Sequence, residues 1–506
     1  MLRDIVSENS VLALALCVAI AAWAMAKRRD ATPAIMDPSG FRMKTLAGDT
    51  RVRRFSHGLE LSNEGFNIAG GSPYLIQNGT RREVVLCRPE HLREFHRGDS
   101  KEHWKAPDGN MGYFFHRLLG ECVGAQSGSE WTNIRSLFDP IYTTSAMSKY
   151  IFTFRKEVQI WLDSLPRHGS IGDIDGSFFT VNIADNCGLL PLKLVAMTLY
   201  GDALSHELFE DLLELSRLRE EVGSNAFMSM RVISRVYSFL PTKANRQLDK
   251  YIAGFRDFNN RIAETAKQHD LKCPLGQIIR QAHCGKAISM QQLLHTVDEI
   301  LFENLDVATS ALSCLLLNMA GDVASQEDVR REARLAVGTL NDRATIDPYM
   351  DRSDTYLEQC CAESRRLCPS IWFTFCERSP NPKIIGGFEV PANTDVTVDW
   401  RRISLESPIW SLSLDEEQRE ITGYDFFPRR YDHISKADMR YSHVGYGAGA
   451  RRCLGQHFAN LLMRLVLFEV LTRYRISATV QPWELGFRRD KFVLTPNAHK
   501  IRFDRL

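Results

Sequence analysis

The chain has 506 residues, of which 44% are hydrophobic and 25% are charged, and its formal net charge is +1. This balance is typical of a globular protein with a large core and excludes a disordered chain. The near-neutral charge, without a run of alternating basic and aromatic residues, argues against nucleic-acid binding. The twelve cysteines show no C-x-x-C pair, so we expect free thiols in a reducing compartment.

The N-terminus carries an apolar run without charge at residues 10–26, followed at once by the basic cluster 27–29. The run is just long enough to span a bilayer. A basic cluster after the run favours an anchor over a cleaved signal peptide or a buried helix. We therefore expect a lumenal tail at 1–9, a transmembrane anchor at 10–26, a basic and proline-containing hinge at 27–44, and one cytosolic domain at 45–506.

Beyond the hinge the chain is predicted to be mainly α with small β regions. Alternating residues predict a hairpin at 72–90, and a second β region is expected at 384–398, with a turn at Ala392-Asn393. A long apolar helix is expected at 454–474. Apolar residues also recur at helical spacing in four segments, 139–166, 186–221, 246–268 and 291–320.

A glycine-dense loop at 445–459 runs into the apolar helix that follows Cys453. A thiolate there would accept hydrogen bonds from N–H groups at the helix start, whose positive end stabilises an anion. Gly449 and Gly455 let the backbone pass close to a flat macrocycle, and Arg451 is placed to pair with a carboxylate of that group. The alternative is a structural cysteine in a tight turn.

The pattern Tyr446-x-x-Gly449-x-Arg451-x-Cys453-x-Gly455 resembles the proximal signature of the cytochrome P-450 family, with Tyr446 where phenylalanine is usual. The resemblance implies a haem-thiolate catalytic domain over 45–506, with haem b as cofactor and Cys453 as the axial iron ligand. It also implies dioxygen, NADPH electrons from a separate cytochrome P-450 reductase, and a single-pass anchor in the endoplasmic reticulum membrane.

Further motifs match this family in order and spacing. Glu363 and Arg366 lie on one face of a predicted helix and can pair, although such spacing alone is common on surfaces. Arg430 stands where the family has the arginine that completes a buried Glu-Arg-Arg cluster. Trp131 and Arg135, one helical turn apart, resemble the pair that holds a haem propionate, and the alternative is a half-buried indole beside a surface arginine.

The predicted helix at 291–320 resembles the oxygen-side helix of the family, whose acid and following alcohol relay protons to dioxygen. Asp306 stands for the acid, but Val307 follows it where threonine is usual, and the alcohol comes later as Thr309. Either Thr309 orients a water in the relay, or delivery of the second proton is weakened. The third interpretation is that the Thr309 hydroxyl only bonds to a backbone carbonyl.

The resemblance implies a monooxygenase that acts on a sizeable apolar substrate, and several segments look like the fungal branch of secondary metabolism, including enzymes of diketopiperazine-type peptides. The alternatives are oxidative coupling, ring closure or desaturation without oxygen insertion, a peroxide-driven enzyme, and a non-catalytic haem sensor. The pocket walls are expected from Tyr113, Phe114, Phe115, Leu301, Leu305, Trp372, Phe373 and 492–494.

Overall fold

A computed structural model describes residues 34–78, 81–171, 177–229, 234–283, 287–339, 342–414, 419–478, 486–497 and 500–506. The predicted tail, the anchor and the first part of the hinge, residues 27–33, lie outside the described residues and stay predictions. Within the described ranges, one helical stretch, Met290–Ala320, is long and apolar enough to cross a membrane. Because most of this stretch is buried inside the protein, it has the character of a core helix.

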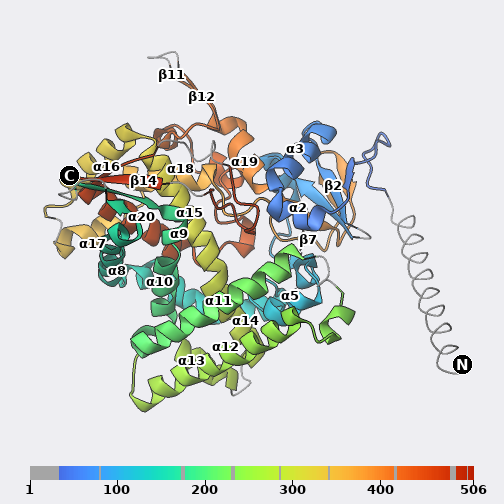
Figure 1. The fold of residues 1–506 in the computed structure, drawn as a ribbon. Helices are drawn as coiled ribbons and strands as arrows, with labels where there is room; N and C mark the ends of the chain where they lie inside the picture. The colour runs from blue at the N-terminus through green and yellow to red at the C-terminus, as the bar shows by residue number, and fades with distance from the viewer. Residues whose placement is uncertain are drawn as a thin grey trace, which may run out of the picture.

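The described chain is mostly helical, as predicted (Figure 1). The N-terminal half contains α2 (Thr50–Ser56), α3 (Gly58–Ala69), α4 (Pro89–His96), α5 (Tyr113–Leu119), α6 (Gly128–Phe138), α7 (Thr144–Ser148), α8 (Ile151–Ser164), α9 (Ile183–Asn186), α10 (Leu189–Tyr200), α11 (His206–Met228) and α12 (Lys243–Gln268). The C-terminal half contains α13 (Pro274–His283), α14 (Met290–Asp298), α15 (Asn304–Ala320), α16 (Val323–Ala336), α17 (Arg343–Asp351), α18 (Tyr356–Leu367), α19 (Trp400–Glu406) and α20 (Gln456–Arg473).

Helix α15 runs through the middle of the molecule and packs against α10, α18 and α20 (Figure 1). Helix α20, predicted at 454–474, is apolar on nearly every side, which is the pattern of a helix surrounded by other elements. A π-helical turn at Glu299–Glu303 joins α14 to α15. Such turns are often found at functional sites, because the extra residue changes which side chains share a face.

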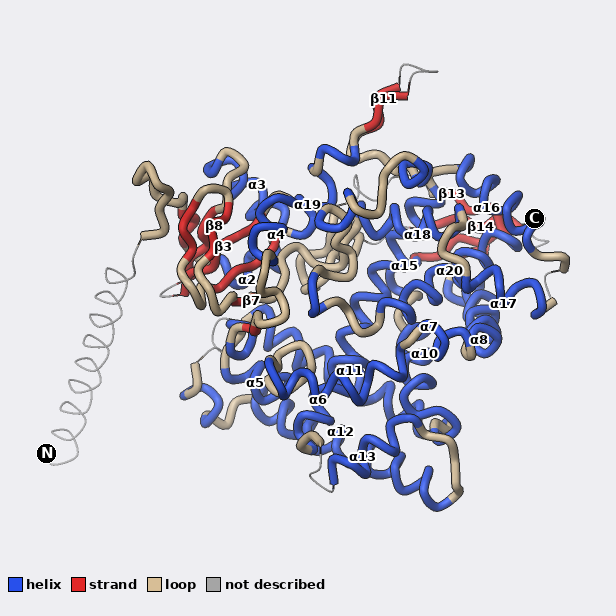
Figure 2. Tube along the Cα trace, turned by 180° about the vertical axis from the view of Figure 1, so that it is seen from behind, coloured by secondary structure: helices blue, strands red, loops and turns tan. Residues whose placement is uncertain are grey.

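The strands form two larger sheets and two short hairpins on the sides of the helical body (Figure 2). The six-stranded sheet has the order β1 (Thr45–Ala47), β2 (Tyr74–Asn78), β3 (Arg81–Leu86), β10 (Asp395–Val398), β7 (Glu377–Arg378) and β4 (Trp104–Lys105). The four-stranded sheet has the order β13 (Tyr474–Ser477), β14 (Lys500–Arg505), β6 (Phe178–Asn182) and β5 (Ser170–Ile171). The short hairpins pair β8 (Lys383–Ile385) with β9 (Phe388–Val390) and β11 (Leu412–Leu414) with β12 (Arg419–Ile421).

Two strand predictions can be compared with this topology. The hairpin at 72–90 is confirmed, since β2 and β3 pair antiparallel with Asn78 opposite Arg81. In the second β region the strands are present and the predicted turn at Ala392-Asn393 is confirmed, with the Thr394 N–H donating to the Pro391 carbonyl at 3.4 Å. A second turn, which was not predicted, lies at Gly386-Gly387. Both glycines have positive φ, which only glycine adopts at little cost, so β8 turns directly into β9. Strand β10 leaves this hairpin and joins the large sheet beside β3.

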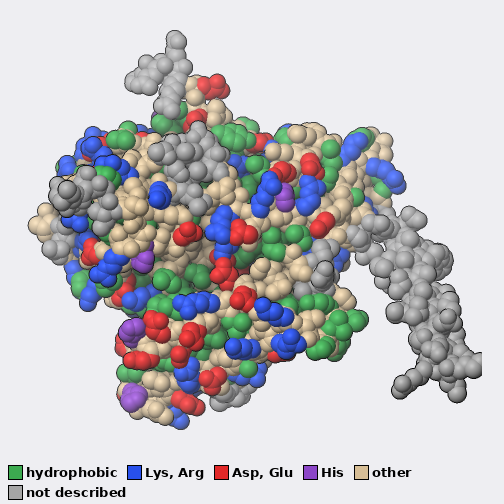
Figure 3. Space-filling model, viewed as in Figure 1, with side chains coloured by type: hydrophobic (Ala, Val, Ile, Leu, Met, Phe, Trp, Pro, Cys, Tyr) green, Lys and Arg blue, Asp and Glu red, His purple; other side chains and the backbone are tan. Residues whose placement is uncertain are grey.

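The surface is mixed in charge. On the face shown in Figure 3, acidic and basic side chains are interspersed over the region of α11, α12 and α13. This distribution matches a net charge of +1.

Candidate active site

The loop before α20 presents the Cys453 sulfur to a cavity of about 410 Å³, here called the cysteine cavity. The backbone N–H of Cys453 donates to the Tyr446 carbonyl at 2.9 Å, which closes the loop just before the helix. Burial raises the pKa of the Cys453 thiol, although the Gly455 N–H and Arg135 act to lower it. A bound metal cation would act in the same direction as these two groups.

The glycines of this loop differ in what they contact. Gly447 and Gly455 line the cysteine cavity, whereas Gly449 does not belong to its described lining. Gly449 has a φ of 71°, and a Cβ added there would lie 3.0 Å from His96 Nδ1. It is therefore needed for the turn and for close packing on α4, rather than for direct approach to the cavity.

Trp131, Arg135 and Arg451 form one edge of the cysteine cavity. The guanidinium carbons of Arg451 and Arg135 lie 4.8 and 5.9 Å from the Trp131 ring centroid. Arg451 Nη2 donates to the Gln126 carbonyl at 2.6 Å, and Arg135 Nη1 donates to the Arg452 carbonyl at 3.2 Å. The two arginines thus bind α6 and its preceding loop to the cysteine loop.

Three further polar side chains at this edge were missed by the sequence reasoning: His96, Lys105 and Glu377. His96 ends α4, and Lys105 lies nine residues later in β4. Glu377 of β7 is far away in the chain and lies beside Lys105 because β4 pairs with β7. Lys105 Nζ lies 3.2 Å from Glu377 Oε2. The buried Nδ1 of His96 has no hydrogen-bond partner within the described ranges, and burial lowers the pKa of this histidine to about 4.

This lining fits a haem. A cysteine on one wall can bind iron, while three cationic side chains and the unpartnered imidazole nitrogen are suited to the carboxylates of a propionate-bearing ring. The cavity walls are otherwise mainly apolar, which suits a flat macrocycle.

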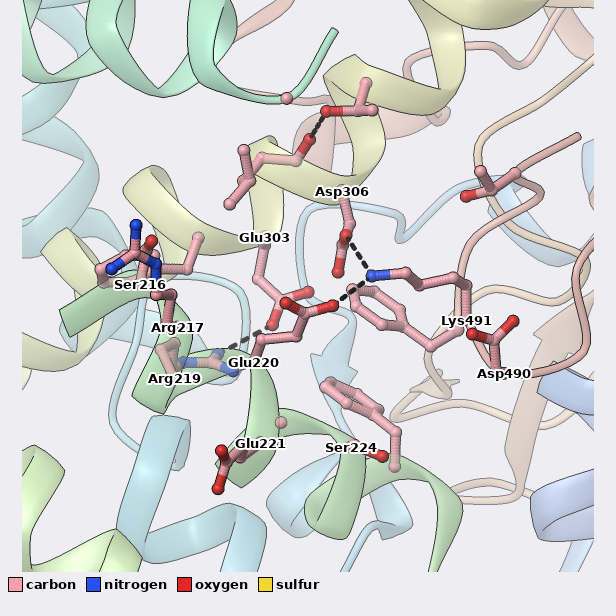
Figure 4. A pocket seen from close by; sticks show the side chains of 18 of the residues that line it. Ser216, Arg217, Arg219, Glu220, Glu221, Ser224, Glu303, Asp306, Asp490 and Lys491 are labelled. Carbon is pink, nitrogen blue, oxygen red and sulfur yellow. Dashed lines mark hydrogen bonds and ion pairs between the residues drawn. The ribbon is translucent and has the colours of Figure 1, made fainter. Parts of the chain in front are cut away.

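Asp306 and Thr309 do not line the cysteine cavity. They face a larger neighbouring pocket of about 1310 Å³, here called the outer pocket. Asp306 Oδ1 lies 3.5 Å from Lys491 Nζ, and Lys491 also pairs with Glu220 of α11 (Figure 4). The Thr309 hydroxyl donates to the Leu305 carbonyl at 2.5 Å, as in the third interpretation of this residue. Val307 lines the cysteine cavity in their place.

Asp306 and Thr309 thus face the outer pocket, whereas Val307 faces the cysteine cavity. The reason is the helical period: residues 299, 303 and 307 share one face, and 302, 305, 306 and 309 share the next one. Burial raises the pKa of Asp306, while the Lys491 ammonium acts to lower it.

The expected apolar walls are only partly present. Leu305 and Phe492 line the outer pocket, but Phe114, Phe115, Leu301 and Trp372 are buried in the core. The outer pocket instead contains many charged groups, from α11, from the π-helical turn, from α15 and from the segment 486–497: Arg217, Arg219, Glu220, Glu221, Glu303, Asp306, Arg488, Asp490 and Lys491. Figure 4 shows how acidic and basic members of this set point toward one another across the pocket.

Glu363, Arg366 and Arg430 form a cluster away from both cavities, with fully buried side chains. Glu363 Oε1 accepts from Arg366 Nη2 at 2.9 Å and from Arg430 Nε at 2.8 Å. Both arginines also donate to backbone carbonyls between residues 404 and 425. The cluster joins α18 to the long loop that precedes the cysteine loop.

A mainly helical fold built around a cysteine-bearing, cation-rimmed cavity defines the class of haem-thiolate oxidoreductases. Residues 63–503 match the sequence profile of the family Cytochrome P450. The chain is 32% identical to cytochrome P450 monooxygenase lepD of Aspergillus flavus, over 86% of this chain and 83% of the relative. It is 30% identical to cytochrome P450 monooxygenase apdB of Emericella nidulans, over 91% of each chain. Its identity to cytochrome P450 monooxygenase opdB of Penicillium oxalicum is 29%, over 89% of this chain and 88% of the relative.

The chain therefore belongs to the cytochrome P450 family and is a P450 monooxygenase. Membership of the family implies a haem cofactor.

Proposed function

We propose that the protein is an anchored monooxygenase of the endoplasmic reticulum membrane that oxidises a secondary-metabolite intermediate with dioxygen. Its catalytic domain faces the cytosol, and its electrons come from NADPH through a separate reductase. The observation that carries the proposal is Cys453, whose sulfur faces a cavity rimmed by Arg135, Arg451 and Lys105. The exposed Arg452, next to this cysteine, is the natural contact for an acidic reductase surface.

The chain's own residues hold the cofactor in this proposal. Cys453 binds the iron, and Trp131, Arg135 and Arg451 hold a propionate, with Lys105 and His96 beside them. The haem, when bound, supplies dioxygen cleavage and hydrogen abstraction from the substrate. Glu363, Arg366 and Arg430 fix the loop that leads to Cys453, so they act on structure rather than on substrate.

The outer pocket supports a sizeable substrate, since its volume of about 1310 Å³ lies above the common range for small-molecule pockets. Its charged lining favours a substrate that carries hydrogen-bonding groups besides an apolar body. Diketopiperazine-type peptides have this character, because two ring amides accompany their side chains. They are the first class to assay.

A second reaction is oxidative coupling, ring closure or desaturation without oxygen insertion. Val307, which has no hydroxyl, lines the cysteine cavity, and the Thr309 hydroxyl is engaged with the Leu305 carbonyl. Turnover under ¹⁸O-labelled dioxygen separates the two reactions. One labelled oxygen per product supports oxygen insertion, and an unlabelled, dehydrogenated product supports the second reaction.

The carbon monoxide difference spectrum of reduced membranes tests the cysteine assignment. The wild type is expected to give the red-shifted Soret band of a thiolate-ligated haem, and Cys453→Ala is expected to lose it. Cys187→Ala is a matched control, because Cys187 is buried in the core away from the cysteine cavity. A band that survives Cys453→Ala would contradict the proposal.

A further inference from the structure

Glu303 stands at the boundary between the two cavities. Of all described residues, it alone lines both the cysteine cavity and the outer pocket. It is the last residue of the π-helical turn and lies one turn before Val307, on the face directed at the cysteine cavity. Its side chain is therefore the described group that the two cavities have in common.

One oxygen of this carboxyl group is held and the other is open. Glu303 Oε1 accepts from Arg219 Nη2 at 3.1 Å (Figure 4). No hydrogen bond to Oε2 is present among the described residues. The side chain keeps 20% of its surface exposed, although protein surrounds it. Arg219 is itself held by Asp298 Oδ1 at 2.9 Å, and the Tyr251 hydroxyl donates to Asp298. A chain of buried groups thus fixes the orientation of Glu303.

The surroundings of Glu303 raise the pKa of its carboxyl group to near neutral pH. Burial raises its pKa to about 7, against the lowering effect of Arg219, and the neighbouring carboxylates of Asp298, Glu299 and Asp306 add to the rise. The other charged groups facing this part of the outer pocket are Glu220 from α11 and Lys491 from the segment 486–497. A carboxyl group with a pKa near 7 can both release and accept a proton at physiological pH.

We propose that Glu303, rather than Asp306, is the proton carrier of this enzyme, moving protons from the outer pocket to the cysteine cavity. Oε2 releases a proton toward the cavity, Arg219 stabilises the carboxylate that remains, and water of the outer pocket protonates it again. Glu303 releases one proton and regains one, so it is neither oxidised nor reduced, and the electrons come from NADPH through the reductase. Arg219 is a positioning residue in this scheme. The inference rests on the proposed dioxygen-consuming function.

The test uses full-length protein with its haem, a P450 reductase and NADPH, without substrate. The measured quantity is the share of NADPH electrons recovered as hydrogen peroxide, because full reduction of dioxygen to water needs more protons than peroxide release. Glu303→Gln is expected to raise this share at least twofold at pH 7. Asp306→Asn is expected to change it less, and an equal or larger effect of Asp306→Asn would overturn the inference.

An infrared titration provides a readout that does not depend on turnover. Wild-type protein is expected to show a buried protonated carboxyl band that disappears with a midpoint near pH 7, and Glu303→Gln is expected to lack it. Arg219→Gln is a second variant, in which the midpoint is expected to move upward by at least one pH unit because the stabilising cation is removed. A band that persists in Glu303→Gln, or a midpoint unchanged in Arg219→Gln, would refute the assignment.

The proposed function and the proton carrier can be refuted separately. If the wild type gives the thiolate band but consumes neither NADPH nor dioxygen, the proposed function is wrong. If the wild type consumes both and Glu303→Gln behaves as the wild type in peroxide release and infrared titration, only the proton carrier is wrong.

Discussion

The substitution Glu363→Gln tests whether the buried Glu-Arg-Arg cluster stabilises the fold through charge pairing. In the wild type, the pKa of Glu363 is lowered, because Arg366 and Arg430 outweigh the effect of burial. Glutamine has nearly the same shape but leaves two guanidinium groups without a counter-charge, and both are fully buried. Removal of one partner of a buried ion pair costs about 3–5 kcal/mol.

The expected change in melting temperature follows from the size of the domain. Unfolding entropy is about 2.1 cal/mol/K per residue, so the roughly 460 residues after the hinge contribute about 1 kcal/mol per degree. A loss of about 3–5 kcal/mol therefore lowers the melting temperature by about 3–5 °C. The full domain unfolds as a unit in this estimate, which coincident loss of haem absorbance and far-ultraviolet circular dichroism would verify.

Differential scanning fluorimetry of the haem-loaded wild type and Glu363→Gln measures the shift. Arg429→Gln is the matched control, since this neighbouring arginine pairs with Asp328 on the surface and such pairs contribute at most about 1 kcal/mol. A Glu363→Gln melting temperature within 1 °C of the wild type would refute the reasoning. It would mean that the carbonyl oxygens around Arg366 and Arg430 suffice to hold both cations.

Two further predictions concern stability. Gly423→Ala places a Cβ 1.8 Å from the Leu405 carbonyl oxygen, so the backbone must shift and a loss of about 1–3 kcal/mol is expected, whereas Gly338→Ala meets no atom within 4 Å and is expected to melt as the wild type. Equal melting temperatures of the two variants would contradict this prediction. Burial lowers the pKa of His295 to about 4, and its Nδ1 accepts the Glu121 N–H at 3.1 Å. Between the unfolded-state pKa near 6.5 and the folded-state pKa of about 4, the unfolded chain binds a proton that the folded chain does not bind. The free energy of unfolding therefore decreases as pH falls through this window, by up to about 1.4 kcal/mol per pH unit. Chemical denaturation at pH 7, 6 and 5 is expected to show a smaller decrease in the free energy of unfolding for His295→Gln than for the wild type. The same pH dependence in both proteins would argue against a neutral, buried His295 imidazole.

Local sequence patterns predicted the parts of the site that depend on neighbours in the chain. Helical spacing placed Glu363 next to Arg366 and Trp131 next to Arg135, and the structure shows both contacts. Spacing could not reveal Lys105 and Glu377, because the pairing of β4 with β7 brings them together across most of the chain. No local signal distinguishes such residues from ordinary strand residues.

The oxygen-side helix shows a second limit of prediction from sequence. The role of Asp306 was predicted from a resemblance to the family motif. A motif match assigns a role to a position but does not say which cavity the side chain faces. The π-helical turn at Glu299–Glu303 and the pairing of Asp306 with Lys491 depend on elements outside the motif. Glu303 was nevertheless accessible from sequence, since its spacing of four from Val307 puts both side chains on one face.

The two cavities are lined by largely different segments of the chain, which has a consequence for how the protein can evolve. Helix α11 and the segment 486–497 contribute to the outer pocket, but none of their described residues lines the cysteine cavity. If the outer pocket binds the substrate, as proposed, mutations in these two segments change the substrate pocket and leave the lining of the cysteine cavity unchanged. Under the proposed function, substrate range and cofactor loading depend on separate stretches of the chain, and a chimera that exchanges only these stretches with a relative is expected to change its substrate selectivity and keep its haem content.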